Sequence, residues 1–529
     1  MVKLPLRPVL PLALGLALLT PAALSALAQA PPPLHAPVTH VIEVMLENHT
    51  FDNLFGNFPG ADGVPANAAL PNPDTNYTAA PVTPAGAPPN EGDTVDINHN
   101  RSAEVMMMDY RPAPLGGGAG YYTGPNLSNA FDPGPPGWKM NYYTTDPQNS
   151  LASITLFGQD NLPNEWFLAR HFVLADHNFQ PAIGPTQPNR IYAVAATTDG
   201  WISDSPPPNT LPIKTIFDEL GQKGLSWRIY QGDYNGPPPT QEGTGFVTHW
   251  NPAWYTPILQ NKHLWNDVAN TSQFFTDVQH GNLPNFSFVV PTWLYSEHPP
   301  TDIQQGDAWL GQLVQAVMDS PYWNSTAIFV TYDEGGGYWD HVSPPVAFRF
   351  GYGTRTPMVI VSPYVRPGVF TQTTSNISVL SFMQQLWGMP PLNSLNARSN
   401  DLLAAFDFQQ KPLPPLNLPD VPADSLQLAD PPENLAATPS VPLTVYVQAK
   451  TPGLTLDTGL SGPVTLQAVE PTGVSAPVGM PSTVQLSGGT AAFQVTFPAI
   501  GYYRLLAQGP DGSQGWVTFD VGVSAATAP

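Results

Sequence analysis

The sequence predicts an α/β fold, with a mostly parallel sheet sandwiched by helices, followed by a small C-terminal β-sandwich. Between residues 38 and 410, short apolar segments alternate with segments of helical period, which is typical of a parallel sheet covered on both faces. A proline-rich stretch then precedes several short segments in which apolar and polar residues alternate, the pattern of a sandwich. The 529 residues are enough for one large domain and an appendage.

The first thirty residues have the plan of a secretory signal peptide. Lys3 and Arg7 precede the apolar stretch VLPLALGLALL, and small residues ending at Ala30 precede three prolines. The apolar core of about 11 residues is shorter than the roughly 20 that a membrane-spanning helix needs. We therefore predict cleavage after Ala30 and a secreted or periplasmic protein without stable membrane insertion.

The amino-acid composition excludes several kinds of catalytic and metal-binding group and one class of partner. Cysteine is absent, which excludes disulfides, a thiolate nucleophile and thiolate metal ligands. The chain has 18 basic and 40 acidic residues, a net charge of -22, which argues against nucleic acid as a partner. A metal ion in this protein must be held by carboxylate, amide, hydroxyl or imidazole groups.

Strands and helices are expected in a regular order through the first part of the chain. Residues 38–46 (VTHVIEVML) are apolar and rich in β-branched side chains, as in a buried strand. The later segments continue the alternation. They are helices in 162–176 and 184–197, a helix and a strand in 211–231, a strand in 286–291, a helix over 303–320, and strands in 327–334 and 357–364.

The same patterns divide the chain into four parts. Residues 1–30 form the signal peptide and residues 31–410 the large α/β domain. Residues 411–440 are rich in proline and are expected to form a linker. Residues 441–529 are expected to form the β-sandwich module, for which we expect a role in stability or docking.

Side chains that bind metal through oxygen follow two of the predicted strands. Glu47 and Asn48 follow the first strand, and Asp333 and Glu334 follow another. In parallel sheets the ligand crevice lies at the carboxyl ends of the strands. Carboxylates gathered there repel one another unless a cation lies among them. We therefore predict a divalent metal ion, with Ca, Mg or Mn favoured by the oxygen ligands.

Thr186 stands at the start of a predicted helix that has Pro188 in its first turn. A threonine at this place is commonly a helix cap. The same place offers free N–H groups and the positive end of the helix dipole to a phosphate. Beside the predicted metal, which would also coordinate its hydroxyl, Thr186 is favoured as a nucleophile.

Histidines and an arginine complete the candidate site. His298 and His341 follow strands on the expected crevice side, and His99 lies in a loop. Imidazole can protonate a leaving oxygen or bind phosphate. Arg190, with its neighbour Asn189, is predicted to contact substrate, although Arg190 can instead pack and pair with an acid.

The stretch TYDEGGGYWDH at 331–341 joins these groups. Its three glycines, Gly335 to Gly337, are expected to let the backbone approach substrate closely and to return Asp340 and His341 to the crevice. The aromatic segment GFVTHWNPAWYTPI at 245–258 is either a lip for transient contact with a lipid surface or a loop packed on its own domain.

At these residues the sequence resembles the bacterial phosphoesterase family that contains phosphatidylcholine-type phospholipases C and acid phosphatases, in the alkaline-phosphatase-like superfamily. The similar stretches are spread over residues 38–410, and the resemblance does not extend to the C-terminal module. They are ENHTFDNLFG at 47–56, GPTQPNRIY at 184–192, SEHPP at 296–300, SPYWNSTAIFVTYDEGGGYWDHV at 320–342 and RTPMVIVSPYVRPG at 355–368.

The resemblance implies roles for particular residues. Glu47, Asn48, Asp333 and Glu334 are expected to form the metal centre, and Thr186 is expected to be the phosphorylated nucleophile. His99, His298 and His341 resemble the phosphate-binding or proton-transfer histidines of the family. The first motif departs from the family at 49–50 and 53–54, which leaves the preferred substrate open.

These observations predict an exported, metal-dependent phosphoesterase of the phospholipase C type, which hydrolyses phosphatidylcholine-like diesters through a phosphothreonine. Family phospholipases often carry two C-terminal β modules, whereas this chain has room for one. One alternative is an acid phosphatase that acts on small phosphate monoesters. Another is a surface-binding protein whose enzyme domain has lost activity.

Overall fold

The computed structural model describes most of the chain. The predicted signal peptide lies outside the described residues, apart from residue 30. The described residues are 30–70, 82–87, 96–108, 140, 143–144, 151–234, 236, 246–260, 266–299, 301, 303–345, 351–419, 425–428, 436–451, 456–469, 476–511 and 513–521.

A mixed sheet of eight strands lies at the centre of the first part, in the order β11-β4-β10-β9-β1-β8-β6-β7. Every described pairing in it is parallel except those that β10 makes with β9 and β4. In chain order the strands are β1 (His40–Leu46), β4 (Val173–Ala175), β6 (Trp227–Gln231), β7 (Val268–Asn270), β8 (Phe286–Val290), β9 (Thr326–Tyr332), β10 (Met358–Val361) and β11 (Gly368–Phe370).

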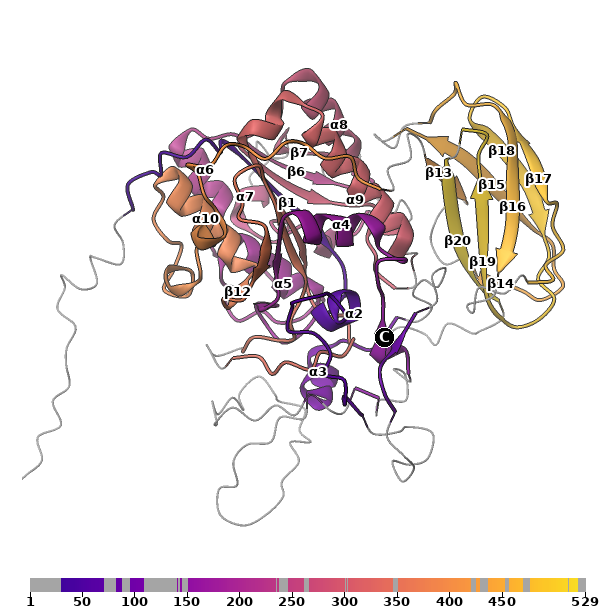
Figure 1. The fold of residues 1–529 in the computed structure, drawn as a ribbon, viewed down its shortest axis with the longest axis horizontal. Coiled ribbons are helices and arrows are strands. Elements are labelled where there is room, and N and C mark those ends of the chain that lie inside the picture. The colour runs from indigo at the N-terminus through magenta and orange to yellow at the C-terminus, as the bar shows by residue number, and fades with distance from the viewer. Residues whose placement is uncertain are drawn as a thin grey trace, which may run out of the picture.

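Helices cover both faces of this sheet (Figure 1). Hydrogen bonds and close packing group α5, α6 and α10 on one face and α4, α8 and α9 on the other. Their bounds are α4 (Pro163–His171), α5 (Thr186–Ala195), α6 (Ile216–Lys223), α8 (Thr271–His280), α9 (Ile303–Met318) and α10 (Ile377–Trp387). The predicted layered α/β fold is confirmed.

Strand β1 lies in the middle of the sheet. Six of its seven residues are buried, because helices cover it on both sides. It pairs in parallel with β8 on one side and β9 on the other, and Leu46 of β1 stands opposite Tyr332 of β9. Strands β1 and β9 therefore end side by side, so the residues after each of them leave the sheet at the same place.

Shorter elements lie outside the central sheet. The segment after β1 forms a short buried helix, and a second short helix follows the loop that carries His99. The bounds are α2 (Phe51–Phe55), α3 (Arg101–Met107), α7 (Pro257–Gln260), β2 (Ala85–Gly86), β3 (Thr155–Leu156), β5 (Asn178–Phe179) and β12 (Thr374–Ser375).

Two predicted elements differ from the structure. The helix predicted over 162–176 ends at His171, and the next residues form β4, because they pair with β10 and β11. The strand predicted in 357–364 is present, but it runs antiparallel to β9. The strand begins at the edge of the sheet where β9 ends, because the long loop between the two strands returns to that edge and does not cross the sheet.

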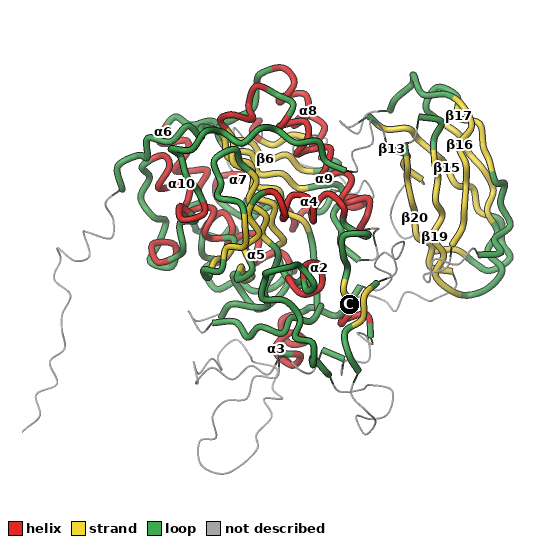
Figure 2. The backbone as a smooth tube through the Cα atoms, in the orientation of Figure 1, coloured by secondary structure: helices red, strands yellow, loops and turns green. Residues whose placement is uncertain are grey.

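The C-terminal part contains strands but no helix among its described residues (Figure 2). Side chains of β15, β16 and β18 alternate between exposed and buried, and the buried ones share one hydrophobic core. A small C-terminal β domain is thus confirmed. Its strands are β13 (Ser425–Leu428), β14 (Ala436–Ala437), β15 (Leu443–Lys450), β16 (Gly462–Val469), β17 (Thr483–Leu486), β18 (Thr490–Val495), β19 (Gly501–Gln508) and β20 (Gln514–Val521).

The range 411–440, for which the sequence predicts a linker, contains ordered structure at both ends. Leu413, Leu416 and Leu418 pack against the core of the first part. Strands β13 and β14 pair with β15 and β20 of the second sheet. Described residues of the predicted linker therefore belong to one or the other of the two cores.

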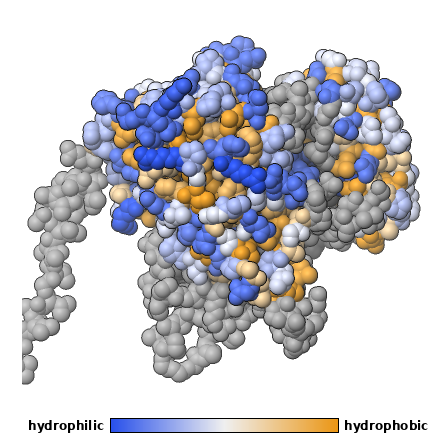
Figure 3. All heavy atoms as spheres, in the orientation of Figure 1, coloured by the Kyte–Doolittle hydropathy of each residue, from blue (hydrophilic) through white to orange (hydrophobic). Residues whose placement is uncertain are grey.

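Within the described ranges, no helix has both the length and the apolar character that crossing a bilayer requires. The face of the molecule seen in Figure 3 carries hydrophobic residues interspersed among hydrophilic ones.

Candidate metal and phosphoester site

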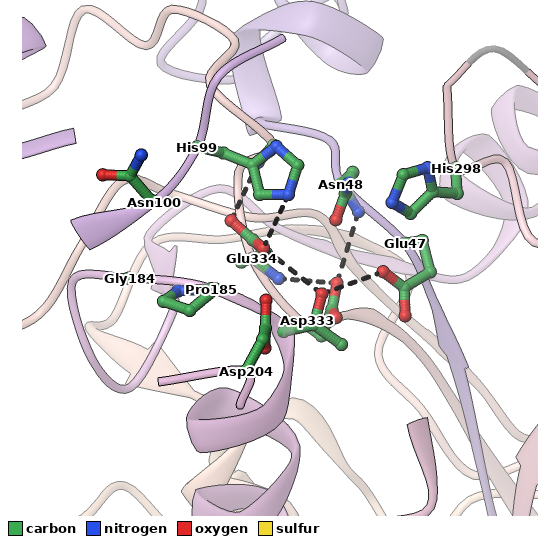
Figure 4. A network of polar contacts seen from close by, with 12 residues as sticks. Glu47, Asn48, His99, Asn100, Gly184, Pro185, Asp204, His298, Asp333 and Glu334 are labelled. Atoms are coloured by element: carbon green, nitrogen blue, oxygen red, sulfur yellow. Dashed lines mark hydrogen bonds and ion pairs between the residues drawn. The ribbon is translucent and has the colours of Figure 1, made fainter. Parts of the chain in front are cut away.

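Two pairs of polar residues meet beyond the ends of β1 and β9. The Asn48 backbone N–H donates to Asp333 Oδ1 over 3.2 Å, and the Glu334 N–H donates to the same oxygen over 2.8 Å. Figure 4 shows the Glu47, Asp333 and Glu334 side chains directed toward one another. All four residues are completely buried. The structure thus brings together the four residues that the sequence predicts as metal ligands.

Thr186 lies against this cluster. Its hydroxyl is 3.2 Å from Glu47 Oε2 and 3.4 Å from Glu334 Oε1. Pro185 occupies the N-cap position, and Thr186 is the first residue of α5. The hydrogen bonds described for its hydroxyl go to these carboxylates. The hydroxyl therefore faces the carboxylates of the predicted metal site.

Arg190 lies one turn further along α5 and is fully buried. Its Nη2 is 2.5 Å from Glu47 Oε1, and its Nε is 3.3 Å from Asp333 Oδ2. The same Nη2 also donates to the carbonyl oxygens of Met45 and Leu46 at the end of β1. The Arg190 guanidinium therefore fixes the positions of two carboxylates. This contact agrees with the alternative prediction that Arg190 pairs with an acid.

Asn189 fixes the turn that leads into α5. Its Nδ2 donates to the carbonyl oxygens of Gly184 and Pro185, and its Oδ1 accepts the N–H of Ala182. The side chain is completely buried. The described polar contacts of Asn189 and Arg190 are to protein atoms, and their predicted contact with substrate stays a prediction.

The cluster has an excess of negative groups. Burial raises the pKa of Glu334 well above its ordinary value, and the carboxylates of Glu104 and Asp333 raise it further. Burial also raises the pKa of Glu47, with a further rise from Asp333 and an opposing effect of Arg190. One guanidinium does not balance these acids, so without a second cation the cluster must retain protons.

The donor set fits a divalent cation. Both side-chain polar atoms of Asn48 are buried, and neither has a hydrogen-bond partner among the described residues. A buried amide without partners costs free energy, which a ligand for its oxygen offsets. Together with the carboxylates of Glu47, Asp333 and Glu334 and the hydroxyl of Thr186, this oxygen forms a set suited to a hard cation.

His99 approaches the cluster from the loop before α3. Its Nδ1 is 2.5 Å from the carbonyl oxygen of Ile97, and its Nε2 is 3.7 Å from Glu334 Oε1. A carbonyl can only accept, so Nδ1 carries a hydrogen. Nε2 and the carboxylate oxygen then face each other favourably only when one of the two holds a proton.

His298 lies beside His99, and the centroids of the two rings are 6.0 Å apart. Its Nδ1 is 2.6 Å from the carbonyl oxygen of Pro299, which makes Nδ1 the donor. Burial lowers the pKa of His298, so the ring is neutral at pH 7 and its Nε2 is an acceptor. His298 is therefore equipped to take a proton in the free protein, and its predicted role in proton transfer or phosphate binding stays a prediction.

His341 belongs to a different cluster. Its Nδ1 is 2.7 Å from Asp52 Oδ2, and Arg355 is paired with Asp52 and with Asp340 at 2.8 Å and 2.9 Å. Among the described residues, no hydrogen bond or ion pair links His341 to Thr186 or the four predicted ligands. The prediction placed His341 in the same crevice, but the structure gives its ring other charged partners.

The glycines in the turn between these clusters let other segments of the chain pack closely against the backbone of the turn. Gly336 and Gly337 have φ values of 59° and 76°, which other residues rarely adopt. A Cβ on Gly336 would lie 2.3 Å from the Asn48 carbonyl oxygen, and one on Gly337 would lie 2.5 Å from Ile97 Cγ2. The turn therefore presses against two segments of the candidate site, a different use from the predicted approach to substrate.

Two further acids belong to the site, and neither was predicted from the sequence. Glu104 Oε2 accepts the Gly184 N–H at 2.7 Å, and burial raises the pKa of Glu104 to about 7. Asp204 Oδ1 accepts the Gln187 N–H at 2.8 Å, so a carboxylate already occupies this N–H at the start of α5. Neither acid follows a predicted strand, and no pattern in the sequence marks them.

Part of the predicted aromatic lip lies beside the site. Trp250 is 2% exposed and stacks on Trp293, with ring centroids 5.5 Å apart. The Arg190 guanidinium lies over the Trp250 ring, 5.6 Å from its centroid. Trp293 also packs against His298 at 4.6 Å. These rings support the site from within the domain, which agrees with the packing alternative.

Comparison with known proteins shows one family over most of the chain. The model of the phosphoesterase family matches residues 38–390. The region that matches contains the four predicted metal ligands, Thr186 and the three predicted histidines.

Relatives in two organisms are named as phospholipases. Non-specific phospholipase C4 of Arabidopsis thaliana is 27% identical over 367 residues, which cover 63% of this chain and 63% of the relative. Phospholipase C A of Mycobacterium tuberculosis (strain H37Rv) is 26% identical over 426 residues, which cover 71% of this chain and 78% of the relative. The chain thus spans less than two thirds of the length of the plant protein.

Among solved structures, a protein of the alkaline phosphatase superfamily from Vibrio parahaemolyticus is similar, with a TM-score of 0.31 and 16% identity. The similarity covers 57% of this chain and 73% of that protein.

Proposed function

The chain belongs to the phosphoesterase family, and from this premise we propose that it is an exported, metal-dependent phospholipase C that hydrolyses phosphatidylcholine-like diesters with Thr186 as nucleophile. The relatives named phospholipase C support the class of substrate. The observation that carries the mechanism is the Thr186 hydroxyl, 3.2 Å from Glu47 Oε2 and 3.4 Å from Glu334 Oε1 at the start of a helix.

The proposed metal ligands are Glu47, Asn48, Thr186, Asp333 and Glu334. A divalent cation held there would supply positive charge that acidifies the Thr186 hydroxyl and stabilises the phosphoryl oxygens. Ca, Mg and Mn are favoured because the donors are oxygens. Arg190 keeps the carboxylates of Glu47 and Asp333 in position for this role.

The residues of the chain account for each proton. Thr186 Oγ1 attacks phosphorus, and its hydrogen leaves toward the carboxylate oxygens to which the hydroxyl already points. The P–O bond to the diacylglycerol oxygen breaks, and the proton shared by His99 Nε2 and Glu334 passes to that oxygen. The products of this half-reaction are diacylglycerol and a Thr186 that carries phosphocholine in ester linkage.

Water completes the cycle. The neutral His298 has Nε2 as an acceptor, so it can take a proton from water that attacks the phosphothreonine. The Thr186 oxygen leaves phosphorus and takes back the proton held by the carboxylates, and phosphocholine is released. The proton on His298 then passes to the neighbouring His99–Glu334 pair, which restores the starting state. Trp293 packs against the His298 ring and stacks on Trp250, and these contacts hold the imidazole in place.

Phosphorus NMR tests the proposal. Phosphatidylcholine and a simple phosphate monoester are each incubated with the parent protein and with Thr186→Ala, with and without chelator. We expect phosphocholine from the metal-replete parent and a loss of at least a thousandfold in rate for Thr186→Ala, because the attacking oxygen is gone. Unchanged turnover by Thr186→Ala would overturn its role as nucleophile.

The same experiment separates the alternatives. Free phosphate released from the monoester alone would identify an acid phosphatase that uses the same site. Absence of turnover on both substrates, with retained binding in chelator, would identify a binding protein that has lost activity. The predicted signal peptide supports export, and mass determination of the mature N-terminus in the native host checks for cleavage after Ala30.

A further inference from the structure

Asp204 lies on the loop between α5 and α6 and reaches the start of α5, beside the proposed nucleophile. Its Oδ1 accepts the Gln187 N–H over 2.8 Å, and Gln187 directly follows Thr186 in the chain. Figure 4 shows the Asp204 carboxylate pointing toward the acids that follow β9. A negative side chain is therefore placed where the free N–H groups of a helix bind the oxygens of a phosphate.

The start of α5 offers few backbone donors to a phosphoryl group. Among its first three residues only Thr186 and Gln187 have an N–H, because Pro188 has none. Asp204 occupies the second of these two donors. A phosphoryl group that enters the site thus meets a carboxylate at a donor that would otherwise stabilise one of its charged oxygens.

The Gln187 side chain holds the loop that carries Asp204. Gln187 Oε1 accepts from Trp201 Nε1 over 2.9 Å, and Gln187 Nε2 donates to the Asp204 carbonyl oxygen over 3.4 Å. Trp201 also packs against a small hydrophobic cluster that includes Ile191 of α5. Bonds to the backbone and to the side chain of one residue therefore fix the Asp204 carboxylate at the helix start.

The charge of Asp204 acts on the acids of the proposed metal centre. Burial raises the pKa of Glu334, and the carboxylates of Glu104, Asp333 and Asp204 raise it further. The Arg190 guanidinium is already shared by two other carboxylates. An additional negative charge on a substrate at this position therefore adds to a repulsion that the described residues leave unbalanced.

We propose that Asp204 determines specificity in the proposed phosphoesterase site, on which this inference rests: its carboxylate favours phosphodiesters over phosphate monoesters. A diester carries about one negative charge at pH 7, whereas a monoester carries about two. Asp204 would thus make the site that of a phospholipase C and not that of an acid phosphatase.

The two kinds of substrate differ at one substituent of phosphorus. When diacylglycerol leaves phosphatidylcholine, the substituent that stays is the uncharged ester oxygen of choline. In a monoester the same position is a charged oxygen, which the Asp204 carboxylate repels and which lacks the Gln187 N–H as a donor. Phosphocholine, the product, is itself a monoester, so the same carboxylate favours its release.

Phosphatidylcholine and phosphocholine are a matched pair of substrates, since both contain the choline ester. Phosphorus NMR measures kcat/KM for a short-chain phosphatidylcholine and for phosphocholine with the full chain in magnesium chloride, as parent and as Asp204→Asn. The amide oxygen of the variant can still accept the Gln187 N–H. We expect kcat/KM for hydrolysis of phosphocholine to choline and phosphate to rise at least about tenfold, mainly through a lower KM, and that for the lipid to change less than about threefold.

Binding of inorganic phosphate separates this inference from the proposed mechanism. Calorimetric titration of the parent and of Asp204→Asn in magnesium chloride needs no turnover, and we expect the variant to bind phosphate at least about tenfold more tightly. This difference in affinity remains even if Thr186 is not the nucleophile or the chain hydrolyses neither substrate.

Two further variants isolate the effect. Asp199→Asn removes an exposed charge from the same loop and should leave both kcat/KM values and the phosphate affinity unchanged. Asp204→Ser removes the charge with a smaller side chain and should act in the same direction as Asp204→Asn. Thermal melting checks that each variant is folded.

Equal phosphate affinity for the parent and Asp204→Asn would overturn the proposal, and so would an equal change in kcat/KM for the two substrates. The carboxylate would then only attach its loop to the start of α5.

Discussion

Asn48 combines two unusual features at the scale of a single residue. Its backbone has a φ of 61°, in the left-handed region, and both of its buried side-chain polar atoms are without a hydrogen-bond partner in the described structure. Both features cost stability in a folded protein. A metal ion that accepts the amide oxygen as ligand explains why this residue is an asparagine, since asparagine tolerates a positive φ.

Asn48→Gly separates these contributions. Glycine adopts the same φ without strain and removes the unpaired amide, so we expect the metal-free protein to be as stable as the parent. Affinity for the divalent ion should fall at least tenfold, because one ligand is lost. Calorimetric titration with Ca, Mg and Mn measures the affinity, and thermal melting in chelator measures stability.

Asp199→Gly is the matched control for this change. Asp199 is exposed and also has a positive φ, of 52°, so its replacement should leave metal affinity unchanged. Equal metal affinity for Asn48→Gly and the parent would remove Asn48 from the ligand set.

The glycine turn after β9 acts at the scale of an element. Gly336 and Gly224 both have positive φ, of 59° and 71°, but only Gly336 is crowded. We expect Gly224→Ala to cost about 1–2 kcal/mol, for the backbone conformation alone. Gly336→Ala should cost at least about 1 kcal/mol more, because the new Cβ lies 2.3 Å from the Asn48 carbonyl oxygen.

Urea unfolding of the two variants measures the difference. Gly336→Ala should also weaken metal binding, since the Asn48 segment must move, whereas Gly224→Ala should not. Equal losses of stability for the two variants would show that the close approach of Gly336 to Asn48 does not affect the free energy of unfolding.

A second element-scale feature anchors the loop that carries His298. The Tyr332 hydroxyl is 2.7 Å from Glu165 Oε1 and 2.6 Å from Glu297 Oε2. One hydroxyl hydrogen cannot serve two carboxylates, so the group retains an added proton. Burial raises the pKa of Glu165 to about 7 and that of Glu297 well above its ordinary value.

The sign of the resulting pH dependence depends on these shifts. Both acids bind protons more tightly in the folded state. The contribution of Glu165 to stability is therefore present below about pH 4.5 and is lost as pH rises through about 7, and the contribution of Glu297 is also lost as pH rises. The metal-free protein should lose on the order of 2–3 kcal/mol of unfolding free energy over this window from Glu165. Urea unfolding in chelator between pH 5 and about 8 measures it.

Glu165→Gln should flatten this dependence, because an amide does not titrate. Asp160→Asn, at an exposed position, should leave the dependence as it is in the parent. An unchanged slope in Glu165→Gln would mean that its carboxyl group does not titrate in this window.

At the scale of the whole molecule, the end of the first core differs from the predicted domain boundary. The Trp323 Nε1 donates to the Leu413 carbonyl oxygen, and Gln315 bonds to the backbones of Leu416 and Leu418. All three leucines lie beyond residue 410, where the sequence places the start of the linker. The segment up to residue 418 therefore helps to close the first core.

Two truncations test this assignment. Residues 30–419 should fold and keep phosphoesterase activity without the C-terminal strands, since the two hydrophobic cores share no residue. Residues 30–410 should melt at a temperature several degrees lower, because burial of the three leucines and their hydrogen bonds is lost. Equal melting temperatures would place the boundary at 410, as the sequence predicts.

Local patterns in the sequence determined the layered fold and one part of the site. The apolar segments that became β1, β9 and α5 were recognisable from residue type and period alone. Because neighbouring parallel strands end at the same edge, the acids that follow β1 and β9 were expected to meet. Their side chains do meet, and Thr186 joins them.

Other features depend on contacts between distant segments, which no local pattern records. The antiparallel direction of β10, the capture of Arg190 by two carboxylates and the separate cluster of His341 all arise from such contacts. The sequence determined which chemical groups leave the central sheet. The tertiary structure decided their neighbours, their burial and their proton content, because these depend on the groups that packing brings around each side chain.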